Sequence, residues 1–313
     1  MLGKTANGLF WMYRYLERAE NTARLIETGQ RIALTRLDGS EEEWTSVLQS
    51  ARALEAFREH NEDLTKDAAI DWLLRSKANP SSVLCCIEAA RQNARMVRTA
   101  LTGEVWEATN AAYMEAKALL ARKVSERDLP HVLRSIRQQT ALVRGMTHGT
   151  MLRNEIYDFV RLGTFLERAD NTARILDVKY YVLLPSASAV GTSLDNVQWE
   201  TILRSLSARG GFRMEHGAGG GPLEITHFLI LDRRMPRSLA FCVRKLRENL
   251  RYLDDDTPGM MPSLRQLNHL EGSYLSHDIN AIFDYGLHEF IQKILQLLAE
   301  ISHQIEIDFR FYE

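Results

Sequence analysis

Apolar residues recur along most of the chain at i, i+3, i+4 and i+7, a spacing that places them on one face of an α-helix. In the first half this pattern covers 8–36, 41–59, 80–101, 104–123 and 131–149. In the second half it covers 151–184, 196–208, 222–233, 236–253 and 278–308. Alternating runs rich in Val, Ile and Thr, which would indicate strands, are missing. The sequence therefore predicts an all-α fold with long helices.

One eleven-residue phrase occurs twice, as LERAENTARLI at 16–26 and as LERADNTARIL at 166–176. Further matches follow in the same order at offsets of 155 and 156: WTSVLQS with WETILRS, Phe57 with Phe212, Pro80 with Pro236, and Cys86 with Cys242. The offset grows slowly, as small loop insertions would produce. Two copies of this size also differ from a solenoid, whose repeats are shorter and more numerous.

We interpret the matches as a tandem duplication of a helical bundle unit. The predicted copies are 1–149 and 150–313, related by a pseudo-twofold axis and packed as one globular unit.

Placed on a helix, the first phrase has an apolar side that includes Leu16, Ala19 and Ala23. Its polar side, a sector of roughly 120°, carries Arg14, Glu17, Glu20, Asn21 and Arg24. The second phrase rebuilds this stripe with Glu167, Asp170, Asn171 and Arg174. Arg18 and Arg168 lie at the flank of each stripe.

The repeated charges need an explanation, because an exposed ion pair on a helix contributes only about 0.3–0.5 kcal/mol. An exposed face would also tolerate Lys, yet the arginine positions of both phrases keep Arg: Arg18, Arg24, Arg168 and Arg174. The planar guanidinium of Arg binds a carboxylate through two hydrogen bonds, which Lys cannot reproduce. One hypothesis is a buried polar network that joins the two copies. The other is a ligand site at their junction, where the arginines hold a carboxylate or phosphate and the glutamates hold an amine or act as acid and base. The residues alone leave both hypotheses open.

The contexts FWMYRYLERAENTARLIE and FVRLGTFLERADNTARILD resemble the Alpha-E family, also called DUF403. The resemblance covers essentially the whole chain and includes the NPSSV and MPRSL helix starts at 79–83 and 235–239. It implies a bacterial all-helical domain with a Glu-Arg motif, typically duplicated. The motif falls on Glu17-Arg18 and Glu167-Arg168, with Arg24 and Arg174 following.

The resemblance also implies partners. Family members are typically encoded beside circularly permuted ATP-grasp ligases, transglutaminase-like proteins and an N-terminal-nucleophile peptidase. They have been proposed to serve in a peptide synthesis or modification system, without an established catalytic mechanism. The family tends to have Gly-Arg ahead of the motif, whereas this chain has Tyr13-Arg14 and Gly163-Thr164. Each copy keeps one of these two residues. A pocket that used the same arginine from both copies would therefore lack one of them.

Composition narrows the classes of function. A formal net charge of -2 without a Lys/Arg-rich run gives no expectation of nucleic-acid binding. Neither a signal peptide nor a run of 18 apolar residues is present, so we expect a cytoplasmic protein without membrane spans. The cysteines Cys85, Cys86 and Cys242 form no C-x-x-C pair and are expected to be buried apolar residues.

We find no sequence signature of a cofactor, metal or catalytic nucleophile. Glu300 and His303 form one E-x-x-H, whereas a di-iron bundle needs two. The Gly-rich 216–222 lacks the ending of a phosphate-binding loop, and the run Asp254–Asp256 is more typical of a solvated helix end.

Three functions follow as hypotheses. The first is a non-catalytic partner that docks on an ATP-grasp ligase or presents a peptide to it. The second is an enzyme or receptor that binds an amino acid or peptide carboxylate through its Glu/Arg stripes. The third, a metalloprotein, rests only on the isolated E-x-x-H and the aspartate run.

Overall fold

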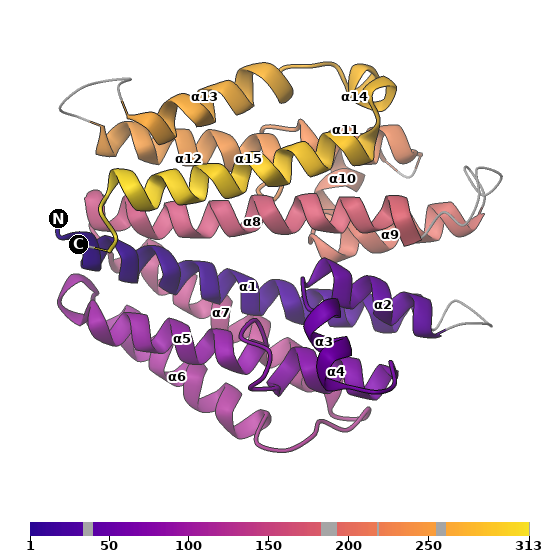
Figure 1. Cartoon of the computed structure of the whole chain (residues 1–313), viewed down its shortest axis with the longest axis horizontal. Helices are drawn as coiled ribbons and strands as arrows, with labels where there is room; N and C mark the ends of the chain where they lie inside the picture. Colours follow the sequence, from indigo (N-terminus) through magenta and orange to yellow (C-terminus); the bar gives the residue numbers. More distant parts are fainter. Residues whose placement is uncertain (34–39, 183–192, 218, 255–260, 313) are drawn as a thin grey trace. The chain divides into compact units, whose positions relative to one another are not determined.

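A computed structural model describes residues 1–33, 40–182, 193–217, 219–254 and 261–312. All regular structure in these ranges is helical, which confirms the predicted all-α class (Figure 1). Of the described helices, none combines the length and the apolar character that crossing a membrane requires. The chain divides into two compact units: Met1–Thr164 with Arg310–Glu313, and Phe165–Phe309.

The units meet inside α8 (Glu155–Val182), whereas the predicted sequence copies meet at 149/150. The first ten residues of α8 therefore pack with unit 1 and the remainder with unit 2. A compact unit and a sequence copy are thus different divisions of the chain, and the duplication stays a prediction.

Unit 1 is built on four long helices, α1 (Gly3–Ala33), α5 (Val83–Met96), α6 (Gly103–Leu119) and α7 (Leu129–Thr150). Helix α1 packs on both α5 and α7, and α6 closes the bundle between them (Figure 1). Three shorter helices, α2 (Ser40–Ser50), α3 (Leu54–His60) and α4 (Lys66–Arg75), pack beside the bundle, and the 3-10 turn η1 (Arg98–Ala100) follows α5.

Unit 2 contains the rest of α8 together with α9 (Ser193–Ser205), α10 (Arg209–His216), α11 (Pro222–Ile230), α12 (Leu239–Leu253), α13 (Pro262–Tyr274), α14 (Ile279–Tyr285) and α15 (Leu287–Asp308). Helix α13 packs between α12 and α15, and α9, α10 and α11 pack on one another. Helix α8 contacts α12 through Phe165 and Phe241, whose ring centroids are 5.9 Å apart. It contacts α15 through Asp177 and His288, whose Oδ1 and Nδ1 lie 2.6 Å apart.

Helix α1 is buried on nearly every side. The predicted core positions Leu9, Met12, Ala19, Ala23 and Ile26 are all 0% exposed. A helix with buried residues around its whole circumference lies inside a protein rather than on its surface. The charged stripe of the repeated phrase is therefore carried into the interior.

Several predicted helices are interrupted. The predicted helix 41–59 is two helices, because Arg52 has φ 56° and turns the chain between α2 and α3. Ser207 (φ 53°) ends the predicted helix 196–208 early and turns the chain between α9 and α10. Gly286, with φ 107°, divides the predicted 278–308 into α14 and α15. Helices α4, α10 and α13 were not predicted.

Local structure repeats at the predicted offsets. Ser82 caps α5 by accepting from Cys85 N, and Ser238 caps α12 by accepting from Phe241 N. Helix α5 therefore begins at Val83, three residues after the predicted start at Pro80. The thiols of the two matched cysteines point to matched carbonyls: Cys86 Sγ to Pro80 O at 3.9 Å and Cys242 Sγ to Pro236 O at 3.8 Å. Such repetition is what a duplication would produce.

Within unit 1, α8 begins with a very close backbone approach to α1. A Cβ on Gly163 would lie 2.1 Å from the carbonyl oxygen of Phe10, so no side chain fits there. Gly163 therefore has a packing role in the second copy. Thr164 fills the next position, and its hydroxyl donates to Val160 O at 2.9 Å.

We expect Gly163→Ala to destabilise the protein by about 3 kcal/mol or more, because the methyl group would force the two backbones apart. Gly145→Ala is the matched control, since Gly145 also lies inside a helix but has open space around its Cβ position. That control should stabilise by up to about 1 kcal/mol. Urea unfolding followed by circular dichroism measures both, and equal stability of the two variants would contradict the close approach.

A second stability prediction concerns Asp158 in the first turn of α8. Burial raises the pKa of this carboxyl to about 6, against an opposing effect of Arg161. Between its unfolded pKa and pH 6 the native state therefore holds a proton that the unfolded state has lost, so the free energy of unfolding falls as pH rises through this window.

We expect Asp158→Asn to stabilise the protein at pH 8 by about 1 kcal/mol, a figure reduced because the side chain is half-exposed. The gain should vanish near pH 4. Exposed Asp63→Asn is the control, and urea unfolding at both pH values is the measurement. A variant less stable than wild type at pH 8 would show instead that the charged carboxylate is needed.

Candidate functional site

The repeated phrase of α1 centres on Glu20, whose side chain is 0% exposed. Its Oε1 accepts from Arg24 Nε (3.0 Å) and Nη2 (2.7 Å) on the same helix. Its Oε2 accepts from two side chains of α7, Thr140 Oγ1 at 3.2 Å and Arg144 Nη1. Both oxygens of this buried carboxylate are thus held by the protein's own donors, which is what a desolvated charge requires.

The contacts of Glu20 belong to a longer polar seam between α1 and α7. Arg144 Nη1 also lies 3.6 Å from Oε2 of Glu17, which is 1% exposed. One turn before Glu17, Tyr13 pairs with Thr147, and two turns after Glu20, Arg137 Nη1 lies 2.8 Å from Glu27 Oε2. The α1 members follow one another at spacings of four, three and seven residues and so share one face. We call Tyr13, Glu17, Glu20, Glu27, Arg137, Thr140, Arg144 and Thr147 the α1–α7 seam.

Aromatic side chains lie on α1 in the turns just before the phrase. Burial raises the pKa of the Tyr13 hydroxyl above its ordinary range, although the hydrogen bond to Thr147 opposes the shift. Arg14 is 8% exposed, and its guanidinium lies over the rings of Trp11 (4.6 Å) and Phe10 (5.6 Å). Arg14 is therefore packed against rings that attract its charge.

The arginine of each Glu-Arg motif reaches the turn before a matched helix. Arg18 Nη1 lies 3.5 Å from Ser81 Oγ, two residues before α5. Arg168 Nη1 donates to the carbonyl oxygen of Pro236 at 3.3 Å, three residues before α12. In both halves this arginine fixes the motif helix to the start of the helix that packs beside it.

The second phrase, on α8, is also largely withdrawn from solvent. Glu167 is 5% exposed, and Asp170 accepts from Arg174 Nε (2.8 Å) and Nη2 (3.2 Å). Asn171 is 8% exposed, and its Nδ2 makes no hydrogen bond in the described part of the chain. Further along, Asp177 accepts from Gln292 Nε2 of α15 at 2.8 Å and lies 2.6 Å from His288 Nδ1.

The two halves differ in what faces the phrase. Helix α7 supplies Arg137 and Arg144 to the seam, whereas α15 carries no arginine and one lysine, Lys293, which donates to Gln296. The cation that holds Glu17 and Glu20 therefore has no counterpart on α15.

The structure brings together three of the predicted site residues of unit 1, Glu17, Glu20 and Arg24. Arg14 and Arg18 make their described contacts elsewhere, and Asn21 is buried at 3% exposure. Sequence analysis missed the α7 members of the seam. Their spacing, Arg137, Thr140, Arg144 and Thr147, is a polar stripe at helical period and was the available signal.

The other candidates find ordinary structural roles. Asp278 caps α14, while Glu300 and His303 are both exposed on α15. Across the described ranges, no three His, Cys, Asp or Glu side chains are grouped as metal ligands would be. Cys86 and Cys242 are buried as predicted, and Cys85 is half-buried. Asp255 and Asp256 of the aspartate run lie outside the described residues.

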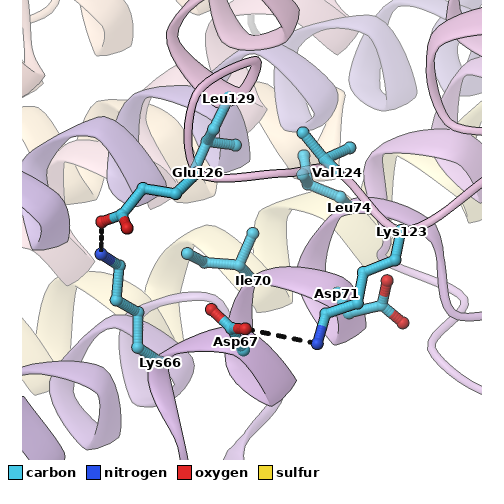
Figure 2. Close-up of a pocket in the computed structure, with 9 residues that line it drawn as sticks. All are labelled: Lys66, Asp67, Ile70, Asp71, Leu74, Lys123, Val124, Glu126 and Leu129. Carbon is cyan, nitrogen blue, oxygen red and sulfur yellow. Dashed lines mark hydrogen bonds and ion pairs between the residues drawn. The ribbon is translucent and has the colours of Figure 1, made fainter.

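A small hollow lies between α4 and the segment that joins α6 to α7 (Figure 2). Two ion pairs border it, Lys66 with Glu126 and Lys123 with Asp67 at 3.4 Å, around the apolar side chains of Ile70, Val124 and Leu129. It has room for about one water molecule.

Comparison with known proteins identifies the family. The sequence model of Alpha-E, described as a predicted alpha-helical domain with a conserved ER motif, matches residues 1–309. No curated protein and no solved structure matches the chain. Glu17-Arg18 and Glu167-Arg168, near the start of the two phrases, are the pairs that the resemblance assigns to this motif.

We expect Arg144→Met to destabilise the protein by about 3 kcal/mol, because it leaves two buried carboxylates short of a partner. Arg31→Met is the matched control, since Arg31 pairs with Glu27 at 3.0 Å but is 49% exposed and should cost less than about 1 kcal/mol. In a double-mutant cycle with Glu20→Gln, urea unfolding should give a coupling energy above about 1 kcal/mol. Equal costs for Arg144→Met and Arg31→Met would contradict a desolvated seam.

Proposed function

The chain belongs to the Alpha-E family, and we propose that it serves as a non-catalytic helical subunit of a peptide synthesis or modification system. Its partner in this proposal is a circularly permuted ATP-grasp type ligase, on which it docks or to which it presents a peptide. Transglutaminase-like proteins are further proposed partners, and the cytoplasm is the proposed compartment. The partners come from what the family resemblance implies.

The observation that carries the proposal is the state of Glu20. A catalytic or ligand-binding carboxylate needs an open side toward the substrate. Glu20 has no exposed surface, and both its oxygens accept from Arg24, Thr140 and Arg144. This arrangement supports a motif whose charges fix the bundle, so that function lies in the surface that the bundle presents to a partner.

A second candidate is binding of an amino acid or peptide carboxylate by the phrase on α8. It is favoured by one observation: the buried Nδ2 of Asn171 lacks a hydrogen bond, and a buried polar group without a partner calls for explanation. Arg174 is 18% exposed and retains donors toward solvent. A carboxylate bound there would be held by the Arg174 guanidinium and the Asn171 amide.

The test of the first proposal is co-purification of the full chain with an ATP-grasp ligase from its own genome, followed by ATP turnover with amino acids and peptides. We expect the ligase to co-purify and its turnover to rise at least several-fold when the chain is present. Failure of both would overturn the proposal.

Variants of the motif separate the two candidates. Under the first, Glu17→Gln should change turnover only as far as it lowers stability, measured by urea unfolding in parallel. Under the second, Asn171→Ala should weaken binding of an amino acid in a calorimetric titration while the protein stays as stable as wild type. Exposed Asn268→Ala on α13, remote in sequence from either phrase, is its control.

A further inference from the structure

Three arginines of unit 2 converge on one carboxylate oxygen, Oε1 of Glu200 on α9. Arg204 Nη2, one turn further along α9, lies 3.1 Å from it. Arg209 Nε at the start of α10 lies against the same oxygen, and Arg213 Nη2 lies 3.7 Å from it. The four side chains are 31–55% exposed, so the group is accessible from solvent.

The positive charge of this group exceeds its negative charge by two. One carboxylate faces three guanidinium groups, and a guanidinium is charged at any ordinary pH. The acidic residue that α10 carries, Glu215, pairs instead with Arg234, at 2.8 Å. The cluster therefore holds an excess of positive charge that no described acidic side chain balances.

The arginines also keep unused hydrogen-bond donors. Each guanidinium has five N–H groups. Arg204 donates to Glu200 through Nε and Nη2, but Arg213 makes only the loose ion pair. Arg209 contacts Glu200 through Nε, and no described acidic side chain engages its two Nη groups. Arg209 and Arg213 are thus held beside Glu200, while most of their N–H groups are not used by the described part of the protein.

The fold does not need these charges. At the offset of 155 that relates the two halves here, Glu200, Arg204 and Arg209 correspond to Thr45, Gln49 and Leu54. Only Arg213 has a charged counterpart, Arg58. The same local helix, turn and helix therefore forms in unit 1 without the cluster, including the left-handed turn residue.

Packing on the opposite face of α10 fixes the arginines. Phe212 is 4% exposed and lies edge-on to Phe228 of α11, with ring centroids 5.5 Å apart. Arg209 and Arg213 are one turn apart and lie on the side directed to α9. A face so held presents its donors with little loss of conformational entropy on binding.

We propose that Arg204, Arg209 and Arg213 form a binding site for the phosphate group of a small molecule. A phosphate carries about -1.5 to -2 charges at neutral pH, which matches the excess charge, and its oxygens accept from guanidinium forks through short, charge-assisted hydrogen bonds. The proposal does not rest on the function proposed above.

The experiment is a calorimetric titration of the full chain with inorganic phosphate and with AMP, at constant ionic strength set by NaCl. We expect one bound phosphate per chain. Arg209→Gln/Arg213→Gln should lower the affinity about tenfold or more, because it removes two charge-assisted partners. Arg58→Gln, the counterpart in unit 1, should leave it unchanged. Equal affinities would identify the phosphate group alone as the ligand, and tighter binding of AMP would add contacts with the nucleoside.

Glu200→Gln gives the sharpest test, because it removes the one like charge beside the bound anion. It should raise phosphate affinity about three- to tenfold, since a unit charge at such a distance contributes about 1 kcal/mol in water. A purely structural cluster would show no such gain. If the double variant fails to fold, exposed Arg213→Gln alone gives the same test. Heat that NaCl reproduces, or acetate binding as tight as phosphate, would overturn the proposal.

Discussion

The charge of Glu20 is the constraint on which the first bundle depends. Taking a carboxylate out of water costs several kcal/mol even after the protein relaxes, and only partners with good geometry return that energy. Two of its partners, Thr140 and Arg144, come from α7. The position of α7 against α1 is therefore specified by polar contacts as well as by the apolar residues around them. Because the α7 members of the seam recur every three or four residues, a shift of α7 along α1 would separate several pairs at once.

The second bundle solves the same problem with different residues. On α8, Asp170 takes both its described hydrogen bonds from Arg174 of its own helix. The contact to α15 is made further along, where Asp177 meets His288 and Gln292. The arginine of the Glu-Arg motif is the part that behaves alike in both halves, since Arg18 and Arg168 each reach the turn before the neighbouring helix. A shared motif thus coexists with different partners across the bundle.

The sequence predicted the helical class because the apolar period of 3.6 residues is strong in long segments such as 131–149. It missed α4 because ten residues are too few to establish a period, and α13 because Pro and Gly precede it. The turns at Arg52 and Ser207 were missed because neither residue is a glycine, the usual residue at positive φ. For the site, the period assigned Glu17 and Glu20 to one face correctly. It could not supply Arg144, because a repeat pattern shows which residues share a face and says nothing of which distant segment covers it.

The separation of Glu20 and Arg144 by 124 positions has a consequence for synthesis of the chain. Ribosomes add roughly 5–20 residues per second. Helix α1 therefore leaves the exit tunnel roughly 6–25 seconds before the helix that neutralises its carboxylates. During the first part of that interval, before α5 has also emerged, its apolar side has no neighbouring helix of the bundle, and its glutamates keep it in water. The acidic groups that end in the interior of the finished protein thus begin as the solubilising part of a nascent helix.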